Sequence, residues 1–208
     1  MADALRLMNL APRIVERLTI YERLLRKWQT VENLVAPASL NHVWMRHFAD
    51  SAQVLDIVPA ASHWVDLGSG AGFPGMVLAI LLADRADSAV HLIESNHRKC
   101  AFLREVSRET SAKAIVHHGR IETIVPTLEP IDAITARALA PLQVLLDYAE
   151  PLLKKGAIGV FLKGQSVEAE LTKLRRSDNL KLSFVSSKTD RTGRVVVVRP
   201  GGPPPISA

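Results

Sequence analysis

The sequence predicts an α/β protein in which one doubly wound, largely parallel sheet follows a helical extension at the N-terminus. Three observations favour this class. A strand-like apolar run at 63–65 leads into a glycine-rich loop and then into a helix-like apolar run at 76–83. Strand-like and helix-like segments alternate from there to residue 176, which is typical of parallel sheets. Two strand-like runs around a short turn then close the chain and predict a hairpin.

The glycine-rich loop spans 66–75 and reads Asp-Leu-Gly-Ser-Gly-Ala-Gly-Phe-Pro-Gly. Glycines at alternate positions between a strand and a helix let the main chain approach a ligand closely. A dinucleotide fingerprint needs a glycine five positions after Gly68, where this chain has Phe73, and a P-loop needs a Gly-Lys pair that is absent. The spacing instead resembles motif I of S-adenosylmethionine-dependent methyltransferases, so we expect Gly68, Gly70 and Phe73 to contact that cofactor. A tight turn without a ligand is the alternative.

Length and composition indicate one main domain. With 208 residues, of which 48% are hydrophobic, the chain can bury one substantial core. We expect a helical extension over 1–60, a catalytic domain over 61–200 and a mobile tail over 201–208. No run of eighteen apolar residues suits a membrane helix, and the N-terminus lacks the apolar core of a signal peptide. The single cysteine, Cys100, favours a reducing cytoplasm, where we expect a monomer.

The net charge of +5 is unevenly distributed along the chain. Residues 1–137 carry 15 basic and 15 acidic side chains, whereas residues 138–208 carry 11 basic and 6 acidic ones. A basic C-terminal third is compatible with a nucleic-acid partner. A surface that only maintains solubility explains the same numbers, so both interpretations stay open.

Two helices are expected before the first strand. Apolar residues recur at intervals of three and four over 11–28, and a second apolar pattern runs over 40–58. The first should pack as an appended element outside the sheet. In the second, Arg46, His47 and Asp50 fall within about one turn, so their polar groups can gather on one face. For His47, a histidine at the helix surface without a special role is the alternative.

The later elements place further polar residues at strand ends. The remaining strands are expected at 89–94, 114–118, 131–137, 156–162, 181–187 and 194–199, and the helices at 96–110, 141–153 and 165–176. Glu94 ends the second strand, where a parallel sheet brings a carboxylate to a ribose. Arg137 ends the fourth strand and is a candidate contact for the cofactor or a substrate phosphate. After the third strand, Ile121 is expected to flank an adenine ring, with main-chain amides near Glu122 as its anchor.

Two features that support chemistry in other proteins are not expected to do so here. His117 and His118 are adjacent in a strand and point to opposite faces, and no third ligand lies nearby, so we predict no metal site. Cys100 has no histidine or second cysteine as a partner in its helix, so we expect a small core residue.

Several blocks of sequence together resemble one family. They are Arg-His-Phe-Ala-Asp-Ser at 46–51, the loop at 66–75, Arg-Ile-Glu at 120–122, Thr-Ala-Arg-Ala at 135–138 and Leu-Lys-Gly at 162–164. The chain is similar over about residues 28–164 to the 16S rRNA guanine-N7 methyltransferase G family, also called glucose-inhibited division protein B. The resemblance implies the class I methyltransferase fold, a Rossmann-like seven-stranded sheet, and methyl transfer from S-adenosylmethionine to N7 of a guanine in the decoding-region loop of 16S rRNA.

The resemblance also implies roles for individual residues. Gly68, Phe73, Ile121, Glu122 and Arg137 are expected to bind S-adenosylmethionine. Arg46, His47 and Lys163 are expected to lie toward the RNA. The partner is expected to be 16S rRNA alone or the small ribosomal subunit.

The proposed acceptor explains what the sequence lacks. Guanine N7 has a free lone pair and no proton, so no catalytic acid or base is expected, and Arg137 or Lys163 would position the reactants. The Asn/Asp-Pro-Pro-Tyr turn of adenine amine methylation is absent after the fourth strand, and Cys100 lies on the wrong helix for methylation at C5. The alternatives are a methyltransferase for small molecules or proteins, a non-catalytic RNA-binding factor, and a dehydrogenase, which Phe73 disfavours.

Overall fold

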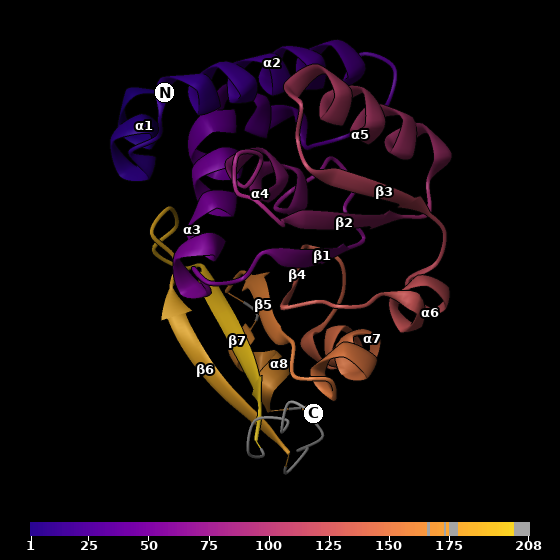
Figure 1. The fold of residues 1–208 in the computed structure, drawn as a ribbon. Helices are drawn as coiled ribbons and strands as arrows, with labels where there is room; N and C mark the ends of the chain where they lie inside the picture. The colour runs from indigo at the N-terminus through magenta and orange to yellow at the C-terminus, as the bar shows by residue number, and fades with distance from the viewer. Residues whose placement is uncertain (166, 173, 175–178, 202–208) are drawn as a thin grey trace.

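The computed structural model describes residues 1–165, 167–172, 174 and 179–201, and in this part of the chain one sheet runs through the whole molecule (Figure 1). Its seven strands have the order β3-β2-β1-β4-β5-β7-β6. They are β1 His63–Leu67, β2 Ala89–Glu94, β3 Ala114–His118, β4 Ala133–Arg137, β5 Ile158–Lys163, β6 Leu180–Ser186 and β7 Arg194–Pro200. β7 lies antiparallel between β5 and β6, and the other pairs are parallel. The predicted fold class is confirmed.

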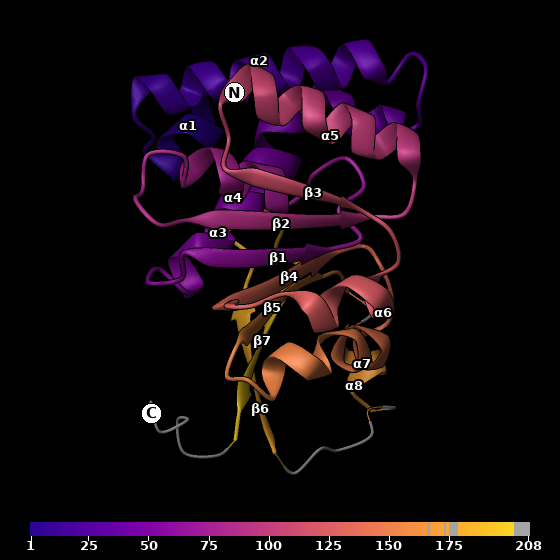
Figure 2. The ribbon, with the colours of Figure 1, turned by 45° about the vertical axis from the view of Figure 1, so that its right-hand side comes forward.

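Helices cover both faces of the sheet (Figure 2). They are α1 Ala2–Met8, α2 Pro12–Trp28, α3 Asp50–Ile57, α4 Gly75–Leu81, α5 His97–Thr110, α6 Ile121–Ile124, α7 Leu142–Leu153 and α8 Val167–Leu171. The α2, α4 and α5 side shares a core with Trp64 of β1, while α7 packs against the opposite face around Val65. Because β1 lies between β2 and β4, the chain crosses to opposite sides of β1, which opens a crevice at the carboxyl ends of the strands.

The single α-helix predicted over 40–58 is wrong. The structure has a 3₁₀ segment at Pro37–His42, a π-helical segment at Trp44–Ala49 and α3 from Asp50. Apolar spacing cannot separate these types, because a π-helical turn holds only one more residue than an α-helical turn and is frequent at functional sites. A further 3₁₀ turn at Val125–Thr127 follows α6.

Other expectations near the termini have mixed outcomes. α1 was not expected. Of the helix predicted over 165–176, α8 accounts for five residues, and residues 166, 173, 175 and 176 lie outside the described part. The predicted mobile tail also lies outside it, apart from Gly201. No helix in the described ranges is both long and apolar enough to cross a bilayer.

The N-terminal helix α2 packs outside the sheet, as predicted. Its apolar stripe is buried and consists of Ile14, Leu18, Tyr21, Leu24 and Leu25. These side chains belong to the same hydrophobic cluster as Trp64 and Leu78. The division into an extension and a domain at residue 60 stays a prediction, and the core runs continuously across it.

Candidate active site at the carboxyl edge of the sheet

The glycine-rich loop takes a backbone conformation that other residues rarely adopt. Gly68, Gly70 and Gly72 have φ angles of +61°, +56° and +91°. A Cβ atom on Gly72 would lie 2.6 Å from the Tyr21 hydroxyl oxygen, and one on Gly68 would lie 2.5 Å from Leu139 Cδ1. At Gly70 the nearest atom outside the adjacent residues is 3.8 Å away. The loop is therefore packed at its ends and faces open space at Gly70.

Glu94, at the end of β2, fastens this loop. Its Oε2 accepts a hydrogen bond of 2.8 Å from the Gly70 amide, and its Oε1 accepts one of 2.7 Å from the Asn96 amide. The two bonds fix the carboxylate beside the open part of the loop. Because a carboxylate can accept about four hydrogen bonds, it retains capacity for hydroxyl donors. Its predicted contact with a ribose stays a prediction.

Asp66, at the start of the loop, is a buried carboxyl with an unused oxygen. Its Oδ2 accepts a hydrogen bond of 3.2 Å from the Gly75 amide, whereas its Oδ1 has no hydrogen-bond partner among the described residues. Burial raises the pKa of Asp66 to about 7, against the opposing charge of Arg137. A buried polar atom without a partner is costly in a folded protein. Asp66 therefore places an unsatisfied acceptor under the loop.

Phe73 lies in a group of rings at the other end of the loop. Its ring stacks on Tyr21, with 5.4 Å between centroids, and on His47, with 4.6 Å. The guanidinium carbon of Arg137 lies 5.0 Å from the Phe73 centroid, within the range of a cation–π interaction. The Tyr21 hydroxyl donates a hydrogen bond to the Ala71 carbonyl. The sequence placed Tyr21 only in an apolar stripe and gave no sign of this contact with the loop.

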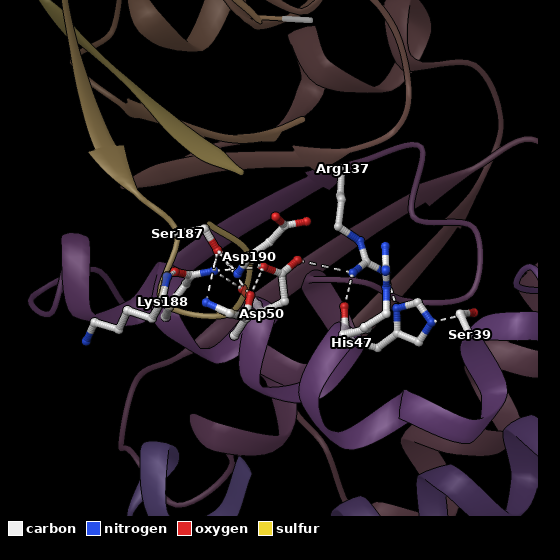
Figure 3. A network of polar contacts seen from close by, with 10 residues as sticks. Ser39, His47, Asp50, Arg137, Ser187, Lys188 and Asp190 are labelled. Atoms are coloured by element: carbon white, nitrogen blue, oxygen red, sulfur yellow. Dashed lines mark hydrogen bonds and ion pairs between the residues drawn. The ribbon is translucent and has the colours of Figure 1, made fainter. Parts of the chain in front are cut away.

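Arg137 connects the loop to the helical segment before α3 (Figure 3). Its Nη1 donates to the Arg46 carbonyl at 2.9 Å and to Asp50 Oδ2 at 3.3 Å. Its Nη2 donates to His47 Nδ1 at 2.9 Å, so the His47 proton is on Nε2, which donates to Ser39 Oγ at 2.9 Å. Burial, followed by the charges of Arg137 and Arg46, lowers the pKa of His47 to about 3 and keeps the ring neutral. The predicted gathering of Arg46, His47 and Asp50 is confirmed.

Asp50 also holds the turn between β6 and β7. Its Oδ1 accepts hydrogen bonds of 2.6 Å from Thr189 Oγ1 and 2.8 Å from Gln53 Nε2. Gln53 Oε1 in turn accepts one of 2.8 Å from the Lys188 amide. The turn at 187–193 is thereby fastened to α3, which lies more than 130 residues earlier in the sequence. No local pattern in the sequence pointed to these contacts.

A cavity of about 480 Å³ with both polar and apolar lining lies beside this network, over the ends of β4 and β5 and the start of β7. Its lining includes Ser39, Arg46, His47, Asp50, Arg137, Lys163, Asp190 and Arg194. Arg46 is exposed, whereas the Lys163 ammonium donates to the Ala140 carbonyl and pairs with Glu170 Oε2 at 2.8 Å. The three residues expected to lie toward RNA therefore meet at one cavity. Their RNA contacts stay predictions.

Ile121 and Glu122 lie elsewhere, at the start of α6 beyond the end of β3. The Ile121 side chain is buried, and Glu122 is exposed beside Tyr148, whose pKa it raises. Their predicted contacts with an adenine ring stay predictions. Among the described residues there is no group of three side chains that suits a metal ion. His117 contacts His91 instead, with 2.8 Å between ring nitrogens.

Comparisons with known sequences agree on one family. The model of the GidB family, described as rRNA small subunit methyltransferase G, matches residues 14–194. Proteins named ribosomal RNA small subunit methyltransferase G include one from Bradyrhizobium sp. strain BTAi1, which is 49% identical over 95% of this chain and 89% of its own length. Another, from Parvibaculum lavamentivorans, is 49% identical over 93% of this chain and 86% of its own length.

Solved structures agree on the fold. The O-methyltransferase TomG from Streptomyces achromogenes, solved in complex with SAM, superposes with a TM-score of 0.59 over 89% of this chain and 90% of its own, at 18% identity. A putative O-methyltransferase from Klebsiella pneumoniae superposes with a TM-score of 0.59 over 93% of this chain and 91% of its own, at 11% identity. At such identities the likeness concerns the fold alone.

Proposed function

The chain belongs to the GidB family of rRNA small subunit methyltransferases G, and on that premise we propose that it methylates N7 of one guanine in the decoding-region loop of 16S rRNA, with S-adenosylmethionine as donor. One observation supports this most directly. Arg137 contacts both the Phe73 ring of the glycine-rich loop and His47 on the wall of the cavity, so it links the proposed cofactor site to the proposed base site. A methyl donor and an acceptor base would then meet beside Arg137.

The residues around the loop fit S-adenosylmethionine. Gly70 borders open space, and Glu94 can accept hydrogen bonds from hydroxyl groups. Asp66 Oδ1 has no hydrogen-bond partner among the described residues, so its carboxyl can interact with a positive charge nearby. We propose further contacts from Gly68, Phe73, Ile121, Glu122 and Arg137. When bound, this cofactor supplies an electrophilic methyl group on a sulfonium. The loop residues hold and orient it and keep the main chain close to it.

The cavity suits one base extruded from a folded RNA. Its volume lies in the range typical of small-molecule sites, and enzymes that modify bases commonly extrude them. Guanine N7 carries a lone pair in the ring plane, so the reaction needs no proton acceptor. His47 agrees with this, because its ring is neutral and both its nitrogens are hydrogen-bonded. We propose that Arg46, His47 and Lys163 form the RNA-facing wall of the cavity.

Positioning is then the main contribution of the protein to the rate. Arg137 is held by His47, Asp50, the Arg46 carbonyl and the Phe73 ring, so its guanidinium is fixed before any substrate arrives. Well-oriented reactants can lower a barrier by about 7 to 11 kcal/mol in the best cases. A fixed cation between the two half-sites orients both substrates without taking part in proton transfer.

The acceptor atom can be tested with one substituted nucleotide. Small ribosomal subunits, reconstituted with 16S rRNA, would carry either guanosine or 7-deazaguanosine at the position that the enzyme methylates. We expect labelled S-adenosylmethionine to transfer its methyl group to the first RNA and not to the second, because 7-deazaguanosine has C–H in place of N7. Equal transfer to both would contradict the proposal, as would incorporation only into protein or small molecules.

The partner is therefore 16S rRNA, alone or within the small subunit, and the proposed location is the cytoplasm, where ribosomes are assembled. We propose a monomer, because one chain supplies both the loop and the cavity. Sedimentation of the enzyme alone would test whether it is a monomer, and sedimentation with small subunits would test whether it binds them.

A further inference from the structure

The cavity must select guanine, and the reaction limits how it can do so. Arginine often recognises guanine by donating to O6 and N7 together. Under the proposed function, on which this inference rests, N7 accepts the methyl group, so its lone pair faces the cofactor and accepts no hydrogen bond during transfer. Selection then falls on the Watson–Crick edge, which enzymes that extrude bases commonly read.

A carboxylate is the side chain that best matches this edge of guanine. Guanine presents two donors side by side, N1–H and the 2-amino group, and one carboxylate oxygen has two lone pairs with which it can accept from both. Adenine presents an acceptor at N1 and has no 2-amino group, so the same carboxylate would meet it with unfavourable contacts. A carboxylate on the wall of the cavity can therefore distinguish the two purines.

Two carboxylates line the cavity among the described residues, Asp50 and Asp190. Asp50 is occupied within the protein, since Oδ2 pairs with Arg137 and Oδ1 accepts from Thr189 and Gln53. Asp190 is exposed on the turn before β7.

The hydrogen bonds to Asp190 prepare it for an incoming base. The Thr192 amide and hydroxyl both donate to Oδ1, at 2.9 and 2.7 Å, so this oxygen is occupied and Oδ2 is the oxygen left to accept from a base. These hydrogen bonds hold the pKa of Asp190 below its usual range, so the group is ionised at neutral pH.

The position of the turn agrees with the orientation that the reaction requires. The turn lines the cavity directly, whereas the glycine-rich loop lies behind His47 and Arg137, which line the cavity and contact Phe73 of the loop. Figure 3 shows Asp190 beside Ser187 and Asp50, across the polar network from His47, which stacks on Phe73 of the loop. A purine with N7 toward the loop turns its Watson–Crick edge toward the turn. We infer that Asp190 accepts hydrogen bonds from N1–H and the 2-amino group of the target guanine and so determines base specificity.

Inosine separates this role from a structural one, because it keeps N7, O6 and N1–H and lacks only the 2-amino group. The measurement is kcat/KM for methyl transfer to reconstituted small subunits that carry guanosine or inosine at the methylated position. We expect the wild-type enzyme to be slower on inosine by about 10- to 100-fold, the usual effect of one lost hydrogen bond to a charged group. Asp190→Asn should be slower on guanosine by a similar factor and should treat both substrates alike.

Asp190→Asn is the informative variant because its amide oxygen can still accept from Thr192, so the turn is retained. Its thermal unfolding and its affinity for S-adenosylmethionine should match those of the wild type. Asp147→Asn, an exposed change on α7 outside the cavity lining, is the matched control and should keep the wild-type preference for guanosine.

Two outcomes would overturn the inference. One is a wild-type enzyme that uses guanosine and inosine equally well. The other is an Asp190→Asn enzyme that keeps the wild-type ratio, because a purely structural turn would slow both substrates together. Failure of the proposed function looks different, since the wild type would then transfer no methyl group to guanosine subunits, or would also transfer it to 7-deazaguanosine.

Discussion

On the side of β1 and β2 the site consists of main chain and packed rings, whereas on the side of β4, β5 and β7 it consists of polar side chains from three distant segments. The loop half owes its shape to glycine conformations and to the stacking of Tyr21 and Phe73. The cavity half owes its shape to hydrogen bonds that Asp50 and Gln53 accept from the turn at 187–193. The first arrangement tolerates little change, while the second can lose one contact at a cost of about 1 kcal/mol.

The largest effect is expected at Gly72, because the tight packing of the loop half leaves no room for a side chain there. Alanine there would combine a φ of +91° with a Cβ only 2.6 Å from the Tyr21 hydroxyl oxygen. We expect Gly72→Ala to lower the free energy of unfolding by about 2 to 4 kcal/mol and to abolish S-adenosylmethionine binding. Denaturant unfolding and calorimetry measure the two quantities.

Gly164 provides the matched control in the cavity half. No atom of the described residues lies within 4 Å of the Cβ that alanine would add there, so Gly164→Ala should bind cofactor normally and unfold like the wild type. Equal behaviour of the two variants would remove the distinction between the halves.

Arg137 belongs to both halves, so its loss should separate activity from stability. We expect Arg137→Ala to slow methyl transfer by about 100-fold or more, because the variant loses the cation that orients both substrates. The free energy of unfolding should fall by only about 1 to 3 kcal/mol, since the neighbours Asp50 and His47 keep other partners. Arg137→Lys should recover little, because a lysine cannot reproduce the three fixed donations.

Single-turnover rates and denaturant titrations measure the two effects of Arg137→Ala. Arg108→Ala, at an exposed arginine on α5, is the control and should change neither. A wild-type rate in the Arg137→Ala enzyme would show that its guanidinium plays no part.

The next effect concerns how the affinity of the loop half for S-adenosylmethionine depends on pH. Asp66 has a pKa raised to about 7 in the absence of cofactor, and a bound cation would favour its carboxylate form. Binding then releases a proton, so affinity for S-adenosylmethionine should rise by up to about tenfold per pH unit as pH approaches 7 and level off above it. Asp66→Asn should bind more weakly and lose this slope, as titrations between pH 5.5 and 8.5 can show. An unchanged slope would exclude Asp66 as its source.

The smallest effect tests how firmly α2 holds the loop. Tyr21→Phe keeps the stack on Phe73 and removes only the hydrogen bond to the Ala71 carbonyl. We expect a loss of about 1 kcal/mol in stability and a few-fold weaker cofactor binding. Thr19→Val, on the same helix but with an exposed hydrogen bond, should leave cofactor affinity unchanged. If both variants bind alike, the contact with Ala71 is not needed for the loop.

The sequence predicted what depends on local pattern. β2 and β3 begin and end where alternation and apolar runs placed them, and the Gly68–Gly75 spacing predicted the loop between β1 and α4. Arg137 was noticed because it ends a strand, and strand ends of parallel sheets meet in one crevice. Apolar spacing missed the π-helical segment at Trp44–Ala49, since it does not report hydrogen-bond type.

The contributions that the sequence could not show come from long-range packing. Tyr21 contacts the loop 50 residues later, and Gln53 holds Lys188 across 135 positions. In the sequence each of these residues is an ordinary member of a helix or a turn. Their role depends on the order of the strands, which brings the last turn of the described sheet next to α3.

The place of β7 has a consequence for the order in which the enzyme is made. The turn that completes the cavity is followed by the strand that enters between β5 and β6, so it leaves the ribosome after every residue of the loop half. A product of premature termination before residue 187 would retain every residue of the loop half and lack the wall opposite it. Such a fragment would also lack Val196 and Val198 of the core on the α7 side, which makes intact translation a condition for the two halves to work together.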